Sequence, residues 1–347
     1  MSEENKRSIR ISVRNLVEFV LRSGDIDNRR SGNAQKDAML AGGRIHRKIQ
    51  KRMGSGYRAE VPLKHEVTDD EQEIVLSVEG RADGIFTENG ITVIDEIKGM
   101  YTDVARLEAP IEVHLAQAMC YGYFYCCDKD LDGIRLQLTY CNLETEEIRR
   151  FQTDRSKEEL EQWFSGVVHE YFKWARYLYH HELTRDASIR NLEFPYPYRE
   201  GQRDLVVSVY RTISRKKRLF IQAPTGIGKT LSTVFPAVRA IGEGKGDKLF
   251  YLTAKTVTRT VAEEALRILR GKGLIFTSVT ITAKEKLCPL ENCECNPDAC
   301  PYAKGHFDRV NEAVFDILHL EQEMTREKIL EYAEKYKVCP FEYCLDI

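Results

Sequence analysis

The spacing of apolar residues divides the chain into two halves with different patterns. The first half predicts helices over 8–22, 34–53, 111–127 and 157–181, and strands over 57–67, 72–86, 91–98 and 134–143. The second half predicts strands over 218–223 and 248–254, and helices over 229–241 and 257–271. Period-2 and period-3.6 patterns therefore alternate along the chain, which predicts an α/β protein whose second half begins as a parallel α/β domain. The segment Asn191–Gln202 has two prolines and no periodicity, and indicates a linker.

Charge is unevenly distributed, although the net charge is only −2. Nine lysine or arginine residues and a single acid lie between Arg29 and Arg58, and a second basic run covers Arg215–Arg218. Such runs are typical of a solvated face, and indicate a phosphate polymer only where matching chemistry lies beside them. The sequence has neither the apolar run of a spanning helix nor the apolar core of a secretory signal, so we expect a cytoplasmic protein.

A tight hairpin with acidic residues is predicted within Gly80–Gly99. The Asn-Gly pair at 89–90 lies between two β-type runs, and a two-residue turn there makes paired residue numbers sum to 179. Asp83 is then expected opposite Glu96, at a separation where two carboxylates repel. A divalent cation between them would turn that repulsion into a site. A salt bridge in which Lys98 neutralises the acids is the alternative.

These residues resemble a known motif. Asp83 followed by Glu96–Lys98 (Glu-Ile-Lys) is similar to the motif of PD-(D/E)XK nucleases in the RecB-like branch. That branch also has a histidine on an upstream helix and Gln-x-x-x-Tyr on a downstream helix. Here "GGRIHRKIQ" supplies His46, and "HLAQAMCYGYFY" supplies Gln117 and Tyr121. The five elements occur in the family's order, which favours the resemblance over coincidence.

The resemblance implies hydrolysis of a phosphodiester. The implied ligands of Mg²⁺ or Mn²⁺ are His46, Asp83 and Glu96, and the ion would polarise the phosphate and acidify a bound water. Lys98 would orient that water or stabilise the developing charge. Gln117 and Tyr121 would contact the DNA backbone or the metal's waters.

A phosphate-binding loop is indicated by "APTGIGKT", residues 223–230. It follows an expected strand and opens an expected helix, which is the context that this motif requires. Backbone N–H groups would cradle phosphates, Lys229 would pair with the β- and γ-phosphates, and Thr230 would bind Mg²⁺. The predicted ATP-binding residues are Gln202, Thr225, Gly226, Ile227, Gly228, Lys229 and Thr230.

Two flanking stretches resemble motifs of superfamily-two helicases. "YREGQRDL" is similar to the Q-motif, which implies that Gln202 reads adenine. "FYLTAKTVTRT" is similar to motif Ia, which implies that Thr253 and Lys255 contact single-stranded DNA. The alternatives are a surface glutamine and an ordinary strand end followed by a helix cap.

Six of the ten cysteines lie in the last 60 residues: Cys288, Cys293, Cys295, Cys300, Cys339 and Cys344. Cysteines at this point resemble those of DinG/XPD-like helicases, in which an iron–sulfur domain is inserted into the first motor lobe. The resemblance implies a [4Fe-4S] cluster on Cys288, Cys295, Cys300 and Cys339, with Cys293 as the alternative to Cys295. Zinc is the rival metal, although zinc modules usually present paired Cys-x2–4-Cys knuckles.

Taken together, the motifs predict a PD-(D/E)XK nuclease mixed sheet flanked by helices, followed by a partial RecA-like lobe with an inserted helical iron–sulfur domain. The boundaries are 1–185 for the nuclease, 186–202 for linker and Q-motif, 203–283 for the lobe and 284–347 for the cysteine region. No Asp-Glu pair follows Lys229, so a Walker B box is absent and we expect a fragment that binds ATP and DNA without unwinding.

The whole protein would be a 5′→3′ DNA helicase fused to a nuclease, acting in repair or recombination on single-stranded or forked DNA. One alternative is a helicase whose inactive nuclease domain serves for grip. Another is a non-catalytic interaction protein that binds ATP or zinc.

Overall fold

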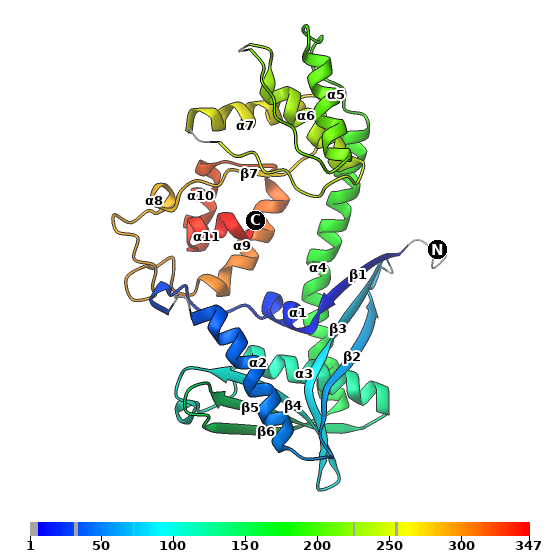
Figure 1. The fold of residues 1–347 in the computed structure, drawn as a ribbon, viewed down its shortest axis with the longest axis vertical. Helices are drawn as coiled ribbons and strands as arrows, with labels where there is room; N and C mark the ends of the chain where they lie inside the picture. The colour runs from blue at the N-terminus through cyan, green and yellow to red at the C-terminus, as the bar shows by residue number, and fades with distance from the viewer. Residues whose placement is uncertain (1–5, 31–33, 72, 225, 254–255) are drawn as a thin grey trace. The chain divides into compact units, whose positions relative to one another are not determined.

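A mixed six-stranded sheet lies at the centre of the first half of the chain (Figure 1). The computed structural model describes residues 6–30, 34–71, 73–224, 226–253 and 256–347. The strands are β1 (Arg7–Ser12), β2 (Arg58–Thr68), β3 (Ile74–Glu88), β4 (Ile91–Met100), β5 (Gly133–Asn142) and β6 (Ile148–Ser156). Their order is β1-β3-β4-β5-β6, and β2 pairs with β3. The pairs β1–β3 and β4–β5 are parallel and the others antiparallel.

The β3–β4 hairpin turns at the expected Asn-Gly pair, where both residues have positive φ. Residues 84–88 of β3 pair with β4 at numbers that sum to 179, which confirms the predicted register there. The sequence also predicted Asp83 directly opposite Glu96, but the paired ladder ends at Gly84 and Asp95 and does not include that pair. The reason is that the Asp83 carboxylate accepts the N–H of Ile97 at 2.7 Å, in place of a backbone carbonyl of β3.

Helices cover both faces of this sheet. They are α1 (Val13–Val20), α2 (Ala34–Arg52), α3 (Glu112–Lys129) and α4 (Lys157–Arg190), with short 3-10 turns η2 (Asn28–Arg30) and η3 (Val104–Arg106). Ile97 of β4 packs with Ile45 and Ile49 of α2, whereas its neighbour Lys98 bonds to Gln117 of α3. Successive side chains of a strand point to opposite faces, so α2 and α3 lie on opposite sides of β4.

The expected helix over 8–22 is wrong in its first third. Residues 7–12 form β1, because they pair in parallel with residues 74–79 of β3, and such a distant partner leaves no trace in local spacing. The helix begins only after Ser12, whose side chain caps it by accepting the N–H of Asn15. The other predicted helices and strands of the first half are found, while β6 was not predicted.

The second half contains helices α5 (Gln202–Ser214), α6 (Lys229–Gly242) and α7 (Thr256–Arg270). In its described residues, the stretches predicted as strands, 218–223 and 248–254, have no strand structure. Side chains there are exposed, with Phe220 at 94% and Leu252 at 89%. A strand needs hydrogen-bonding neighbours, and in the described part of this region only β7 (Ser278–Val279) and β8 (Glu323–Met324) pair.

The cysteine region is helical and folds with the first half of the chain. Its helices are α8 (Lys284–Leu287), α9 (His306–Leu320), α10 (Arg326–Tyr336) and α11 (Pro340–Asp346). One compact unit comprises residues 1–176, 281–315 and 328–347, and a second comprises 177–280 and 316–327. Among the described helices, none has the length and apolar character that a bilayer crossing requires.

Candidate functional site

The end of β3 places Asp83 against helix α2. Nδ1 of His46 lies 3.3 Å from Oδ1 of Asp83. Gln50, one turn further along α2, donates to the backbone carbonyl of Asp83 at 2.9 Å. Burial opposes protonation of His46, but its hydrogen bond to Asp83 and that carboxylate's charge raise the pKa of His46 overall. The predicted histidine and the first predicted acid are therefore direct neighbours.

On β4, Glu96 and Lys98 form a partly buried ion pair. Nζ of Lys98 lies 2.7 Å from Oε1 of Glu96 and donates to Oε1 of Gln117 at 2.8 Å. Glu96 is 4% exposed, and among the described residues its Oε2 has no hydrogen-bond partner. Burial raises the pKa of Glu96 to about 7, with Lys98 opposing the shift and Asp83 adding to it. An unpartnered buried carboxylate oxygen is costly unless a cation or donor meets it.

This donor set suits a hard divalent cation, since it offers two carboxylates and one imidazole. In the described part of the chain, the ligand atoms of His46, Asp83 and Glu96 are not all within 4.8 Å of one another. A shared ion would therefore require these side chains to move, with Glu96 leaving Lys98 and His46 leaving Asp83. Binding would also release the proton that Asp83 favours on His46.

Tyr121 packs against the backbone of β3. It is 6% exposed, and a Cβ placed on Gly80 would lie 2.6 Å from its Oη. Burial, together with the charges of Glu96 and Asp83, raises the pKa of the hydroxyl. Tyr121 therefore remains a neutral phenol that borders the acids.

A second buried acid, Asp95, was not singled out from the sequence. It is fully buried and accepts hydrogen bonds from Thr139 at 2.6 Å, Tyr57 at 2.9 Å and Gln137 at 3.0 Å. A Cβ on Gly84 would lie 1.8 Å from Cζ of Tyr57, so only glycine admits this ring. Asp95 points to the opposite face from Glu96 and anchors the sheet. In the sequence, Asp95 is marked only by its position next to Glu96 in an otherwise apolar strand.

The phosphate-binding motif forms a loop that ends at α6. Gly226 and Gly228 have φ of +88° and +78°, which favour glycine, and α6 begins at Lys229. Nζ of Lys229 donates to the carbonyls of Ala223 and Pro224 at 2.9 Å each, so the ammonium lies inside the loop. The predicted Thr225 lies outside the described residues. Thr230 is partly buried beside Tyr251, with their hydroxyl oxygens 3.4 Å apart.

Gln202 contacts this loop directly. The side chain is 5% exposed, its Nε2 donates to the carbonyl of Ile227 at 2.9 Å, and its Oε1 accepts the N–H of Arg199 at 3.0 Å. A Cβ on Gly228 would lie 2.7 Å from Nε2. The glutamine thus braces the loop. Of the two motif Ia residues, Lys255 lies outside the described residues.

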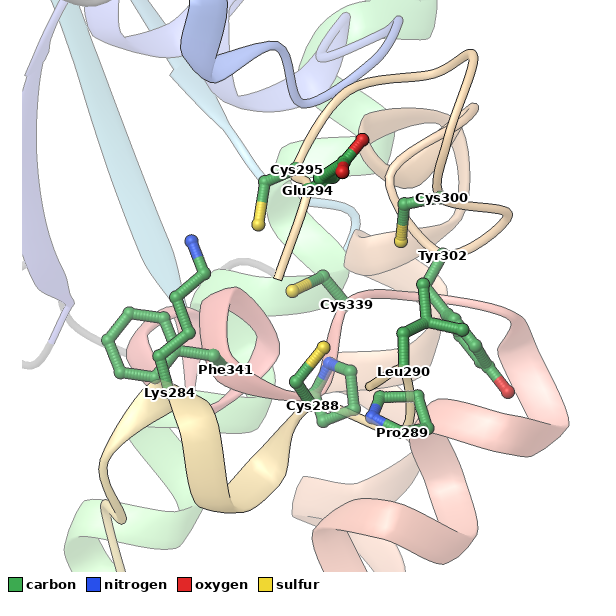
Figure 2. A pocket seen from close by; sticks show the side chains of 11 residues that line it. Lys284, Cys288, Pro289, Leu290, Glu294, Cys295, Cys300, Tyr302, Cys339 and Phe341 are labelled. Atoms are coloured by element: carbon green, nitrogen blue, oxygen red, sulfur yellow. The ribbon is translucent and has the colours of Figure 1, made fainter. Parts of the chain in front are cut away.

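Four cysteines line one pocket, and their sulfur atoms turn toward a common space (Figure 2). They are Cys288, Cys295, Cys300 and Cys339. Cys293 and Cys344 are not among the lining residues. Within the described chain, no three cysteine sulfurs lie within 4.8 Å of one another.

Comparisons with known proteins indicate helicase-like sequence in part of the chain. No protein-family model matches it. A 47-residue stretch is 45% identical to a probable ATP-dependent helicase of Methanocaldococcus jannaschii, and covers 13% of this chain and 7% of that protein. The solved structure of the protein SSO0001 aligns with 48% of this chain and 77% of that one, at 19% identity and a TM-score of 0.32.

Proposed function

We propose that this chain joins a metal-dependent nuclease to the ATP-binding part of a DNA helicase. The observation that carries the nuclease half is the buried, unpartnered oxygen of Glu96, close to Lys98 and to the His46–Asp83 pair. Asp69 also has an unpartnered buried oxygen in the described structure, so the proposal rests on this oxygen of Glu96 together with its charged neighbours Lys98, Asp83 and His46.

In this proposal, His46, Asp83 and Glu96 hold Mg²⁺ or Mn²⁺. When bound, the ion supplies Lewis acidity and lowers the pKa of a coordinated water. Lys98 keeps its ammonium in place through Gln117, and this charge is available for the negative charge that grows on the phosphate during attack. Gln117 therefore positions Lys98, and Tyr121 closes the site from the side of β3.

Exposed basic side chains of α2 favour DNA as the substrate. Arg44, Arg47, Lys51 and Arg52 are exposed on the helix that carries His46, while Ile45 and Ile49 of the same helix are buried. Cations on the outer face of α2 would contact successive phosphates of a strand whose scissile bond reaches His46 and Asp83. Single-stranded or forked DNA is the proposed form.

The helicase half is proposed from the phosphate loop and the local similarity to an ATP-dependent helicase. Lys229 would exchange the carbonyls of Ala223 and Pro224 for the phosphates of ATP. The four pocket cysteines would hold a [4Fe-4S] cluster. The proposed location of the protein is the cytoplasm. In the whole protein the motor would move 5′→3′ in repair or recombination, whereas this chain would bind ATP and DNA without unwinding.

The test is cleavage of end-labelled single-stranded and forked DNA by the intact chain with Mn²⁺ or Mg²⁺. Lys98→Ala should reduce the rate by about 100-fold or more, the size typical of a lost electrostatic stabiliser. Lys64→Ala removes an exposed lysine that pairs with Glu66 on β2, and should leave the rate unchanged. If the wild type binds DNA but no metal induces cutting, the domain serves for grip and the nuclease proposal is wrong.

A further inference from the structure

A short segment that runs from the end of α1 to the first residue of η2 lies against the cysteine region. We call residues 21–28 the strap, and residues 281–315 with 328–347 the cysteine module. Along the strap, the N–H of Ile26 donates to the carbonyl of Ala303 at 3.0 Å, and that of Asn28 donates to the carbonyl of Cys295 at 2.9 Å. The carbonyl of Gly24 accepts the N–H of Phe307 at 3.0 Å. Strap and module are therefore joined by backbone hydrogen bonds.

Carboxylates from both sides add to these backbone bonds. Asp25 of the strap accepts the N–H of Gly305 at 2.6 Å, and Asp308 of the module accepts the N–H of Gly24 at 2.8 Å. Charge-assisted bonds of this kind are about twice as strong as neutral ones. They fix the position of the strap at Gly305, just before α9, and at Asp308 in the first turn of α9.

Arg22 links the strap to the helix that follows Cys339. It lies 2.9 Å from Oδ1 of Asp346 in α11, with both side chains less than a third exposed. The other carboxylate oxygen of Asp346 lies 3.7 Å from Nε2 of the fully buried His306. Nδ1 of His306 accepts the N–H of Cys339 at 3.1 Å. A continuous line of contacts thus runs from Cys339 to the strap.

The same segment is continuous with two helices of the nuclease core. α1, before the strap, buries Val13, Leu16 and Val17 completely. α2, after it, carries His46 and packs on β4 through Ile45 and Ile49. In the sequence, the strap is therefore flanked by α1 and α2, with residues 31–33 before α2 outside the described residues, and along its length it is hydrogen-bonded to the cysteine module.

The loop that carries three of the four pocket cysteines contains no regular secondary structure. Residues 288–300, which include Cys288, Cys295 and Cys300, form neither helix nor strand. Hydrogen bonds around Asn296 order part of this loop, and ligation of its cysteines would add order that a backbone ladder does not supply. The strap is bonded to this loop at the carbonyl of Cys295.

We propose that the strap couples the cysteine centre to the nuclease centre, so that loading of the four cysteines holds α2 with His46 against Asp83 and permits cutting. The inference rests on the proposed function, because it takes the cysteines as metal ligands and His46 as part of the nuclease. Arg22 and Asp25 are positioning residues in this coupling. An intact cysteine centre would then be required for DNA cleavage as well as for the proposed helicase activity.

The first experiment compares iron-loaded chain, purified without oxygen, with chain from which iron was chelated and the chelator then removed. Amide hydrogen exchange should show faster exchange in the strap and in α2 without iron, while β4 and β5 keep their protection. Cleavage of single-stranded DNA with Mn²⁺ should fall about tenfold, as for loss of a supporting shell around a metal site. Equal exchange in the strap and α2 of both forms would overturn the coupling.

Variants test the same idea in the loaded protein. Arg22→Gln and Asp25→Asn should slow cleavage severalfold while iron content and ATP binding stay at wild-type levels. Arg22→Lys should restore most of the rate, because it keeps the charge beside Asp346. Arg14→Gln is the matched control, since the ion pair of Arg14 in the described structure is with Glu18 of the same helix, at 2.7 Å. Full activity of both strap variants would overturn the proposal. Because the variants are tested in the loaded protein, this result remains decisive even if removal of iron unfolds the chain.

The two proposals fail in different ways. A loaded wild type that never cuts contradicts the nuclease function, and hydrogen exchange then still decides whether strap and cysteines are coupled. A loaded wild type that cuts, together with an iron-free form that cuts equally well, contradicts the coupling alone.

Discussion

The ammonium of Lys98 lies 2.7 Å from Oε1 of Glu96, two residues away on the same face of β4, and leaves Oε2 of Glu96 buried without a partner in the described structure. This arrangement is only half satisfied. The second carboxylate oxygen loses its hydration on folding and gains no donor, which costs stability. A cation at this oxygen would offset that cost.

Mn²⁺ is therefore expected to raise the thermal midpoint of the wild type, but not that of Glu96→Gln. Without metal, Glu96→Gln should be more stable than the wild type by about 1 kcal/mol, because a neutral amide replaces a buried carboxylate. Differential scanning calorimetry with and without Mn²⁺ measures both effects. Lys98→Ala is the control, since it keeps all three ligands and should still respond to Mn²⁺. An equal Mn²⁺ shift in Glu96→Gln would show that Glu96 holds no ion.

Acid should destabilise the first unit through His114. Burial lowers the pKa of this histidine to about 4, and the charge of Lys98 adds to the effect. The unfolded chain binds the proton near pH 6.5, so stability is complete above that pH and falls toward pH 4, by about 2 to 3 kcal/mol. Urea unfolding followed by tryptophan fluorescence reports this unit, because both tryptophans, Trp163 and Trp174, lie in it.

His114→Gln should flatten the dependence between pH 6.5 and 4. Burial also lowers the pKa of His65, so part of the slope will remain. His169→Gln at an exposed position of α4 is the control for loss of a histidine. A slope in His114→Gln as steep as that of the wild type contradicts the assignment.

The features that could be predicted from the sequence are those set by residues close to them in the chain. The register of the β3–β4 hairpin follows from its Asn-Gly turn, and the start of α6 follows from the Gly-Lys of the phosphate loop. Both signals lie within a few residues of the structure that they produce. The same applies to α2 and α3, whose apolar spacing predicted both helices.

Features that depend on distant partners could not be read in this way. β1 exists because residues 74–79 offer it a parallel edge. Residues 218–223 are apolar enough for a strand but have no strand partner in the described structure. Spacing left Cys293 and Cys295 as alternatives, and only the fold shows that Cys295 lines the pocket. The strap has no motif at all, since backbone groups make most of its contacts.

Gly80→Ala should move Tyr121 and lower stability by about 1 to 3 kcal/mol, as in other overpacked sites. The added Cβ would meet Oη of Tyr121 at 2.6 Å and the ring at 3.0 Å. Urea unfolding of Gly80→Ala, Tyr121→Phe and the double variant forms a cycle. Because Tyr121→Phe removes the nearest atom, Gly80→Ala should cost less in that background. Strict additivity would mean that the two residues do not touch.

Gln202→Ala should weaken ATP and GTP binding alike, by about tenfold each. The side chain of Gln202 braces the phosphate loop at Ile227, so its loss disturbs phosphate contacts that all nucleoside triphosphates share. Titration with fluorescent nucleotide analogues measures both affinities. Lys229→Ala serves as the reference for complete loss of phosphate binding. A selective loss for ATP would instead support the adenine-reading role implied by the Q-motif.

Cys295→Ser should remove the metal group, whereas Cys293→Ser should keep it. The structure places the sulfur of Cys295 with those of Cys288, Cys300 and Cys339 around one pocket, which Cys293 does not line. Protein purified without oxygen should contain iron and absorb at about 400 nm, a band that zinc does not give. Iron and zinc content per chain, measured beside the spectrum, separates the two metals. Colourless protein with one zinc per chain would refute the cluster, and equal loss of iron in both variants would mean that Cys293 also supports it.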